Sequence, residues 1–184
     1  MSAPSWSLER GANVGDHGAV LFAVWAPRAQ RIAVRLAGLR GHADNPLERL
    51  DDGSFQGVVK AAQVGSDYFY VIDGGRERPD PVSRHQPLGV HGPSRVVDPR
   101  GFRWSDAGWK GVGMRDLVIY ELHVGTFSEA GTFDAAIERL TALRDLGITA
   151  VELMPVAEFP GRRNWGYDGT HPYAPQSTYG GPEG

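Results

Sequence analysis

DLVIYELHVGTF, residues 116–127, opens the stretch that decides the fold of the second half of this chain. Its apolar residues form a nearly continuous run, which is typical of a strand covered on both faces. A helical pattern follows, with Thr132 as the expected N-cap and Gly147 as the expected stop. ITAVELMPVAEF, residues 148–159, repeats the buried-strand pattern. The sequence therefore predicts a right-handed parallel strand–helix–strand unit.

Polar and aromatic side chains gather where these two predicted strands end. His123 follows the first strand, and the loop GRRNWGYDG at residues 161–169 follows the second. In α/β folds the chemistry lies beyond the carboxyl ends of the strands. We therefore take this region as the candidate site, with the following members: His123, Asn164, Trp165, Tyr167 and Asp168.

Three glutamates lie near this candidate site. Glu121 and Glu152 fall inside the predicted strands between apolar neighbours, where acids are usually paired structural groups. Glu158 falls at a strand end, where it can face a substrate. No second carboxylate is fixed at a defined distance from Glu158 or Asp168, so the sequence defines no acid–base pair. The histidines show no metal-ligand spacing with carboxylates, and we predict neither a metal site nor a cofactor.

The N-terminal half has the pattern of short antiparallel strands. Residues 31–36 alternate between apolar and polar side chains, as a half-buried strand does. Strand-like runs at residues 19–25 and 67–72, with the hairpin turn signal Asp52-Gly53 between them, complete the pattern. This spacing predicts a β-sandwich.

A proline-rich segment at residues 79–116 has no clear period and is predicted to connect the two halves. The bulky side chains outside the periodic segments are expected to be structural. We expect Trp25 in the sandwich core, Trp104 and Trp109 buried where the halves meet, and Trp6 and Leu8 anchoring an edge.

Composition excludes several classes of function. The chain has 184 residues, a formal net charge of −3 and no cysteine, which excludes disulfides, zinc–thiolate sites and cysteine nucleophiles. The charge balance gives no basic patch for nucleic acid and no polybasic signal for a membrane. No apolar segment has the length of a signal core or a transmembrane span, so we expect a cytoplasmic protein; its oligomeric state stays open.

The runs VIYELHVGTF, GTFDAAIERL and PVAEFPGRRNWGYDG resemble the start of the catalytic barrel of glycoside hydrolase family 13. Within that family the trehalose-releasing hydrolases are most similar, and glycogen branching and debranching enzymes are less so. The VWAP and DYFYVIDG runs resemble the immunoglobulin-like domain that precedes the barrel, which is related to carbohydrate-binding module family 48. The resemblance implies a sandwich at residues 1–98, a connector at 99–115 and the first βαβ portion of an incomplete TIM (β/α)8 barrel at 116–184.

The resemblance also implies a function. A member of this family cleaves α-glucosidic bonds with retention, using two carboxyl groups about 5–5.5 Å apart. In the family these groups come from later barrel strands, so no catalytic residue carries over and the chain alone is expected to be inactive. The implied substrate is an α-glucan or maltooligosyl trehalose, from which trehalose is released by hydrolysis of an α-1,4 bond. A fragment of a branching enzyme and a non-catalytic glucan-binding module remain as alternatives.

Only binding roles can be transferred to residues of this chain. Tyr167 matches the family tyrosine that stacks under the sugar at the cleavage subsite. Asp168 would accept hydrogen bonds from sugar hydroxyls or cap a turn, and Trp165 and Asn164 would shape the pocket wall, unless Trp165 packs on the barrel rim. His123 is expected to be a hydrogen-bonded residue behind the site. For the sandwich we favour a structural role, in which it packs against the barrel, over a role in sugar binding.

The sequence stops where the third strand of the family would begin, which favours a fragment of a longer enzyme. Two parallel strands and one helix leave long unpaired edges. We therefore expect residues 112–184 to be loosely folded or prone to aggregation when expressed alone.

Overall fold

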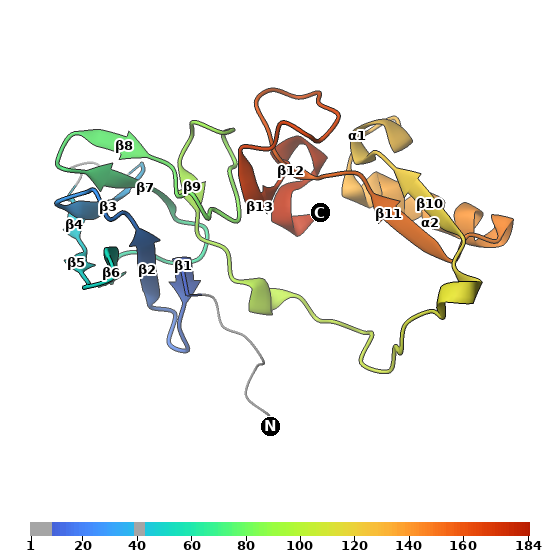
Figure 1. Cartoon of the computed structure of the whole chain (residues 1–184), viewed down its shortest axis with the longest axis horizontal. Coiled ribbons are helices and arrows are strands. Elements are labelled where there is room, and N and C mark those ends of the chain that lie inside the picture. Colours follow the sequence, from blue (N-terminus) through green and yellow to red (C-terminus); the bar gives the residue numbers. More distant parts are fainter. Residues whose placement is uncertain (1–8, 39–42) are drawn as a thin grey trace.

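The computed structural model describes residues 9–38 and 43–184. Its first half is a sandwich of two antiparallel sheets (Figure 1). One sheet has the order β1-β2-β6-β5, and the other has the order β4-β3-β7-β8 with β9 also paired to β7. The strands of the first sheet are β1 (Gly11–Val14), β2 (Val20–Trp25), β6 (Ser54–Val59) and β5 (Glu48–Arg49). Those of the second are β4 (Asn45–Pro46), β3 (Ile32–Leu36), β7 (Asp67–Ile72), β8 (Arg76–Arg78) and β9 (Ser94–Arg95).

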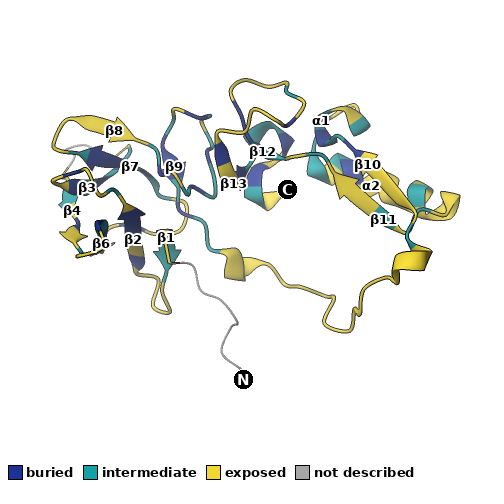
Figure 2. Cartoon of the chain, viewed as in Figure 1, coloured by how far each residue is buried: buried dark blue, intermediate teal, exposed yellow. Residues whose placement is uncertain are grey.

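Alternating side chains build the sandwich core. In β3, Ile32, Val34 and Leu36 are buried and the residues between them are half-buried, as the alternation in the sequence predicts. Phe22 and Tyr68 meet edge to face between the sheets, with ring centroids 4.8 Å apart. Figure 2 shows this buried layer in the strands of the sandwich. The predicted β-sandwich is confirmed by this arrangement.

Three tryptophan predictions are wrong. Trp25 is 53% exposed, because Phe22 and Val24 of the same strand fill the core and Trp25 lies at the strand end. Trp104 and Trp109 are 75% and 71% exposed, since the connector that carries them runs away from both halves of the molecule (Figure 2). Trp6 and Leu8 lie outside the described residues.

The second half contains the predicted parallel unit. β10 (Ile119–Leu122) pairs in parallel with β11 (Ala150–Leu153), in a register that joins Ile119 to Ala150. Helix α2 (Phe133–Leu146) connects the two strands. Thr132 Oγ1 accepts a hydrogen bond from the Ala135 N–H, and Gly147 ends the helix with φ of 102°, so both predicted helix ends are confirmed.

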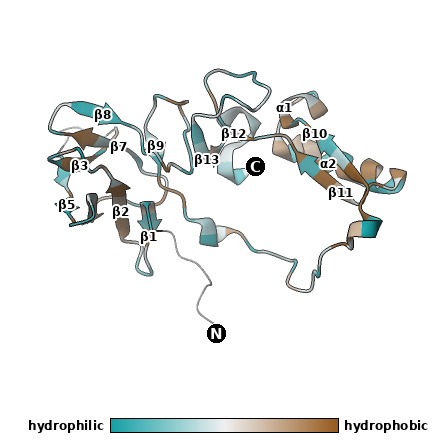
Figure 3. Ribbon diagram, viewed as in Figure 1, coloured by the Kyte–Doolittle hydropathy of each residue, from teal (hydrophilic) through white to brown (hydrophobic). Residues whose placement is uncertain are grey.

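The predicted burial of these two strands is wrong for this chain. Ile119 is 56% exposed and Leu153 is 47% exposed, because β10 and β11 have only each other as neighbours in their sheet. In α2, Ile137 is 60% exposed. Figure 3 shows the apolar character of β10 and β11, which Figure 2 shows as largely exposed.

Additional elements complete the second half. Helix α1 (Val124–Phe127) follows β10, and the antiparallel pair β12 (Ala157–Glu158) and β13 (His171–Pro175) encloses the loop that contains the predicted site. Short 3-10 helices are η1 (Pro99–Gly101), η2 (Met114–Asp116), η3 (Ser177–Tyr179) and η4 (Gly181–Glu183). Among the described residues, none of the helices has the length and apolar character needed to span a membrane.

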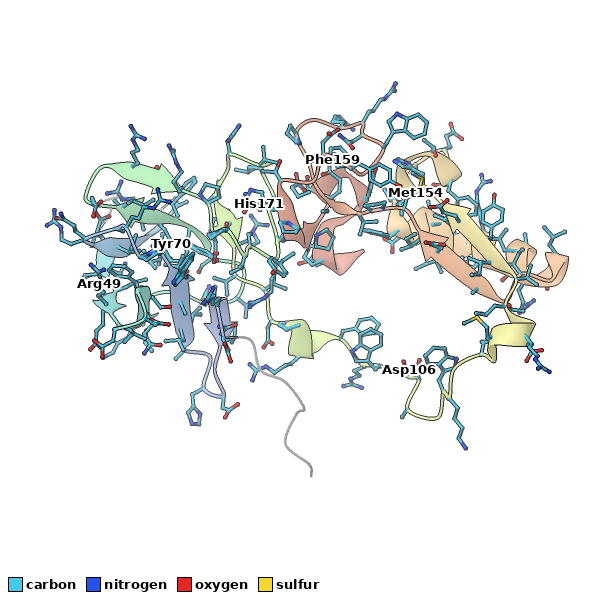
Figure 4. All side chains as sticks on the ribbon, viewed as in Figure 1. Arg49, Tyr70, Asp106, Met154, Phe159 and His171 are labelled. Atoms are coloured by element: carbon cyan, nitrogen blue, oxygen red, sulfur yellow. The ribbon has the colours of Figure 1, made fainter. Side chains whose placement is uncertain are left out.

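The two halves also touch directly. The buried His171 on β13 donates from Nε2 to the Val90 carbonyl at 3.0 Å, across 81 positions of the sequence. Figure 4 shows His171 between the sandwich and the rest of the second half. The chain therefore leaves the sandwich along the connector and returns to it at β13 (Figure 1).

Candidate functional site

A cavity of about 470 Å³ lies at the carboxyl end of β10, within the usual size range for small-molecule sites. Its walls come from the β10–α1 junction, from the loop between β12 and β13, and from η3. The lining residues are His123, Gly125, Thr126, Arg162, Arg163, Asn164, Trp165 and Tyr179. The location agrees with the expectation that binding residues gather beyond the ends of parallel strands.

His123 is held from both sides of its ring. Its Nε2 lies 2.7 Å from the Asn164 carbonyl oxygen, and because a carbonyl only accepts, Nε2 carries the proton. The Thr126 hydroxyl lies 3.4 Å from Nδ1, which is the acceptor in the neutral ring. The Tyr179 hydroxyl lies 3.3 Å from Nε2. These contacts fix the ring orientation, and the ring also lines the cavity, so His123 lies at the site and not behind it.

Tyr179 forms the floor of the cavity. Its ring packs edge to face on Phe159 and Phe133, with centroids 5.9 and 6.0 Å away. Burial raises the pKa of the Tyr179 hydroxyl, so this group stays neutral in the physiological range. Gly125 lies directly against this ring, because a Cβ at position 125 would come within 2.8 Å of it. The floor is therefore tightly packed and has no room for a side chain at Gly125.

The loop between β12 and β13 brings some of the predicted residues together. His123, Asn164 and Trp165 line the cavity, whereas Tyr167 and Asp168 lie on the same loop outside its lining. Trp165 is 77% exposed and Tyr167 is 72% exposed, so both aromatic rings are accessible. Asp168 accepts a hydrogen bond from Asn164 Nδ2 at 2.6 Å, which is a contact within the loop.

Sequence reasoning missed several lining residues. Arg162 and Arg163 directly precede Asn164 in the same sequence run, so their proximity was a usable signal. Gly125 lies two positions after the predicted His123. Tyr179 gave no local signal, because it reaches the cavity only when η3 folds back on α1.

The glutamates near the site are not arranged for acid–base catalysis. Glu158 is 1% exposed and accepts hydrogen bonds from the Ser177 N–H at 2.6 Å and the Ser177 hydroxyl at 3.2 Å, so it holds η3 and does not face the cavity. Burial raises the pKa of this carboxyl. Glu121 and Glu152 are exposed register partners on β10 and β11, not buried as expected. None of the described residues that line the cavity is a carboxylate.

A second hollow, of about 450 Å³, lies on the sandwich beside the exposed Trp25. Its lining also includes Pro27, Arg28, Ile72 and Asp73. The exposed Asp73 carboxylate accepts hydrogen bonds from the N–H groups of residues 30 and 31 at 2.9 Å. The lining of the hollow therefore includes both an indole ring, from Trp25, and a guanidinium, from Arg28.

Comparisons with known proteins agree with both halves of this description. Residues 9–97 match the family model of carbohydrate-binding module 48, the isoamylase N-terminal domain. The chain is 46% identical over 169 residues to malto-oligosyltrehalose trehalohydrolase of Saccharolobus solfataricus, covering 92% of this chain and 29% of the relative. It is 43% identical over 162 residues to the enzyme of the same name from Deinococcus radiodurans, covering 88% and 26%. The branching enzyme GlgB of Chlamydia abortus is 34% identical over 186 residues, covering 93% of this chain and 26% of that protein.

Solved structures show the same fold. A crystal structure from Salmonella typhimurium, of a candidate alpha amylase, superposes with a TM-score of 0.89 at 43% identity, covering 97% of this chain and 30% of that one. Pullulanase type I from Bacillus subtilis, complexed with maltose, gives a TM-score of 0.79 at 27% identity, covering 95% and 28%. The chain thus spans less than a third of the length of these relatives. Over nine tenths of its length it is similar to malto-oligosyltrehalose trehalohydrolases, and its residues 9–97 match the family model of carbohydrate-binding module 48.

Proposed function

We propose that this chain is the N-terminal part of a retaining α-glucan hydrolase, one that releases trehalose from maltooligosyl trehalose by cleaving an α-1,4-glucosidic bond. The observation that carries the proposal is the cavity at the carboxyl end of β10, with accessible aromatic rings on the loop above it. The identity to the trehalohydrolases, which exceeds the identity to the branching enzyme, favours hydrolysis over transfer to a 6-hydroxyl.

In this proposal the chain supplies binding groups, and the catalytic carboxylates come from elsewhere in the longer protein. The absence of a carboxylate among the described lining residues supports this division. Tyr167 stacks on a sugar ring, Trp165 and Asn164 form the wall of the pocket, and His123 lines the pocket beside them with its Nε2 bonded to the Asn164 carbonyl oxygen. The pullulanase from Bacillus subtilis is described as bound to maltose, which supports a glucan as the ligand class.

The proposal extends to the architecture. Residues 1–98 are a sandwich domain, 99–115 a connector, and 116–184 the beginning of a (β/α)8 barrel in which β10, α2 and β11 are the first strand, helix and second strand. The exposed apolar residues on both strands support this assignment, since a barrel covers each strand with a neighbouring strand and a helix. They are Ile119, Tyr120, Val151 and Leu153.

The test combines an activity assay with a binding assay. The purified chain is expected to release no trehalose from maltooligosyl trehalose, and measurable release would contradict the proposal. In a maltotetraose titration followed by tryptophan fluorescence, Tyr167→Ala is expected to weaken affinity about tenfold, because a lost aromatic contact is worth roughly 1 kcal/mol or slightly more. Tyr173→Ala, which removes a similarly exposed tyrosine on β13, is the matched control and is expected to change little.

A second candidate function is glucan binding by the sandwich itself. The exposed Trp25 beside its hollow favours it, and so does the name of the module that residues 9–97 match. In the same titration, Trp25→Ala distinguishes the two sites. Affinity lost with Trp25→Ala and retained with Tyr167→Ala would place the glucan on the sandwich.

A further inference from the structure

The loop between β12 and β13 carries the two exposed aromatic rings on a backbone that Asn164 ties together. Asn164 Nδ2 donates to Asp168 Oδ2 at 2.6 Å, and Asn164 Oδ1 accepts from the Gly166 N–H at 2.7 Å. Trp165 and Tyr167 lie between these bonded residues. Both polar groups of the Asn164 side chain are therefore engaged inside the loop.

The same loop is attached to the ends of both parallel strands. His123, directly after β10, donates from Nε2 to the Asn164 carbonyl oxygen at 2.7 Å. Gly166 is buried against Pro155, which follows β11, and a Cβ at position 166 would overlap the Pro155 carbonyl oxygen. The backbone that carries Trp165 and Tyr167 is thus fixed to β10 on one side and to β11 on the other.

We propose that Asn164 and Asp168 are positioning residues for glucan binding, joined as the Asn164–Asp168 clasp, and that their side-chain polar groups act on affinity through the loop they order. The inference rests on the proposed function and deepens it. Ordering an exposed side chain and its backbone on binding costs affinity, and a backbone that is ordered in advance reduces that cost. The clasp orders the backbone between two such side chains, so its effect on affinity comes through Trp165 and Tyr167.

A polarity swap tests this inference. Asn164→Asp places two carboxylates at hydrogen-bond distance, which removes the donor and adds like-charge repulsion. The double variant Asn164→Asp with Asp168→Asn restores a donor–acceptor pair of reversed polarity, and the carboxylate introduced at position 164 can still accept from the Gly166 N–H. Asp106→Asn, on the exposed connector labelled in Figure 4, is the control for a one-unit change of charge outside the loop.

Two measurements are made on each variant of the full chain. Loop order is read from ¹⁵N relaxation of residues 164–168 and from hydrogen exchange of the Gly166 amide, and maltotetraose affinity is read from titration. We expect Asn164→Asp to mobilise the loop, to speed exchange of the Gly166 amide at least about tenfold and to weaken affinity by a similar factor. The double variant is expected to restore both properties, and Asp106→Asn to leave both unchanged.

Other outcomes overturn the inference. If the double variant restores loop order and not affinity, the Asp168 carboxylate itself binds the sugar. If Asn164→Asp leaves the loop ordered, the clasp does not hold it. Failure of the wild-type chain to bind maltotetraose would contradict the proposed site, whereas the relaxation and exchange data would still decide whether the clasp orders the loop.

Discussion

Gly166 is the residue on which the geometry of the site loop depends most directly. Its φ of 99° is in the region that L side chains rarely adopt, and its Cα faces the Pro155 carbonyl. We expect Gly166→Ala to destabilise the loop by roughly 1–3 kcal/mol from backbone strain alone, with a further loss from the overlap at Pro155. The measurement is hydrogen exchange of residues 164–168.

Gly161→Ala is the matched control for that prediction. Gly161 has φ of 88°, and a Cβ there would meet nothing within 4 Å. The two variants therefore share the backbone strain and differ in the overlap. Equal losses of protection would show that the close approach at Pro155 is unimportant.

Asp80 is a buried hydrogen-bond acceptor on which the stability of the sandwich depends. It is fully buried, its Oδ2 accepts from the Tyr68 hydroxyl at 2.6 Å, and burial raises the pKa of its carboxyl. We expect Tyr68→Phe to lower the free energy of unfolding of the sandwich by roughly 1–3 kcal/mol, because a buried acceptor loses its partner. Urea denaturation followed by circular dichroism measures the change. Tyr70→Phe, which removes a hydroxyl 3.4 Å from the Ala23 carbonyl oxygen, is expected to cost less.

At the scale of elements, the apolar surface of α2 is the feature with a measurable consequence. Ile137 is 60% exposed, so Ile137→Lys is expected to change the stability of this chain by no more than about 0.5 kcal/mol and to reduce its self-association. Light scattering and thermal unfolding measure the two effects. The neighbouring Ala136 is 8% exposed, and Ala136→Lys is expected to destabilise the helix packing. If Ile137→Lys unfolds the chain, the apolar face of α2 that carries Ile137 must be packed against other residues, contrary to this prediction.

The elements with a clear period were the ones that sequence reasoning located. Thr132 and Gly147 bound α2 as predicted, and the alternation of residues 31–36 gave β3 its buried face. The β12–β13 pair was missed, because two short strands separated by a long loop leave no period to detect. Burial of the tryptophans was mispredicted, because hydrophobicity gives a preference for burial but does not identify a partner for Trp104.

In the candidate site, too, some features follow from the local sequence and others depend on tertiary contacts. Because binding groups follow the ends of parallel strands, we predicted that His123, Asn164 and Trp165 lie together, and all three line one cavity. Tyr179 lines the cavity because η3 packs against α1, and this long-range contact cannot be read from the local sequence. The partnership of Asn164 with Asp168 depends on the turn at Gly166, which has φ of 99°. Local sequence suggested a glycine turn there but not which side chains it joins.

At the scale of the whole molecule, the contact between the two halves is expected to weaken in acid. His85 lies before β9, and the Cβ position of Gly181 in η4 is 3.3 Å from its Nε2. Burial lowers the pKa of His85, nearby Arg95 lowers it further, and Glu183 and Asp67 oppose the change. His171, at the same contact, has a buried Nδ1 without a partner among the described residues.

The direction of the pH effect follows from the lowered pKa of His85. Unfolding or undocking lets the ring return toward its ordinary value of about 6.5, so the opened state binds more protons in acid. The contribution of His85 to the contact is therefore complete above about pH 6.5 and is lost as the pH falls through that value toward the lowered folded pKa. Hydrogen exchange of Gly181 between pH 7.5 and 5.5 measures it.

Two variants control this prediction. His85→Gln is expected to flatten the pH dependence of exchange at Gly181. Glu183→Gln removes a carboxylate that raises the pKa of His85, so it is expected to enlarge the loss in acid. An unchanged profile in His85→Gln would show that the pH dependence of the contact does not arise from His85.

The bond from His171 to Val90 closes a ring of chain that spans 81 positions. The entropy lost on closing a flexible ring of that size amounts to roughly 4 kcal/mol in its logarithmic part alone. The strand pairings within the sandwich and within the β10–α2–β11 unit join residues of shorter sequence separation than this bond does. We therefore expect docking of β13 on the sandwich to be a late step of folding, because closing this long ring costs more entropy than forming contacts of shorter sequence separation.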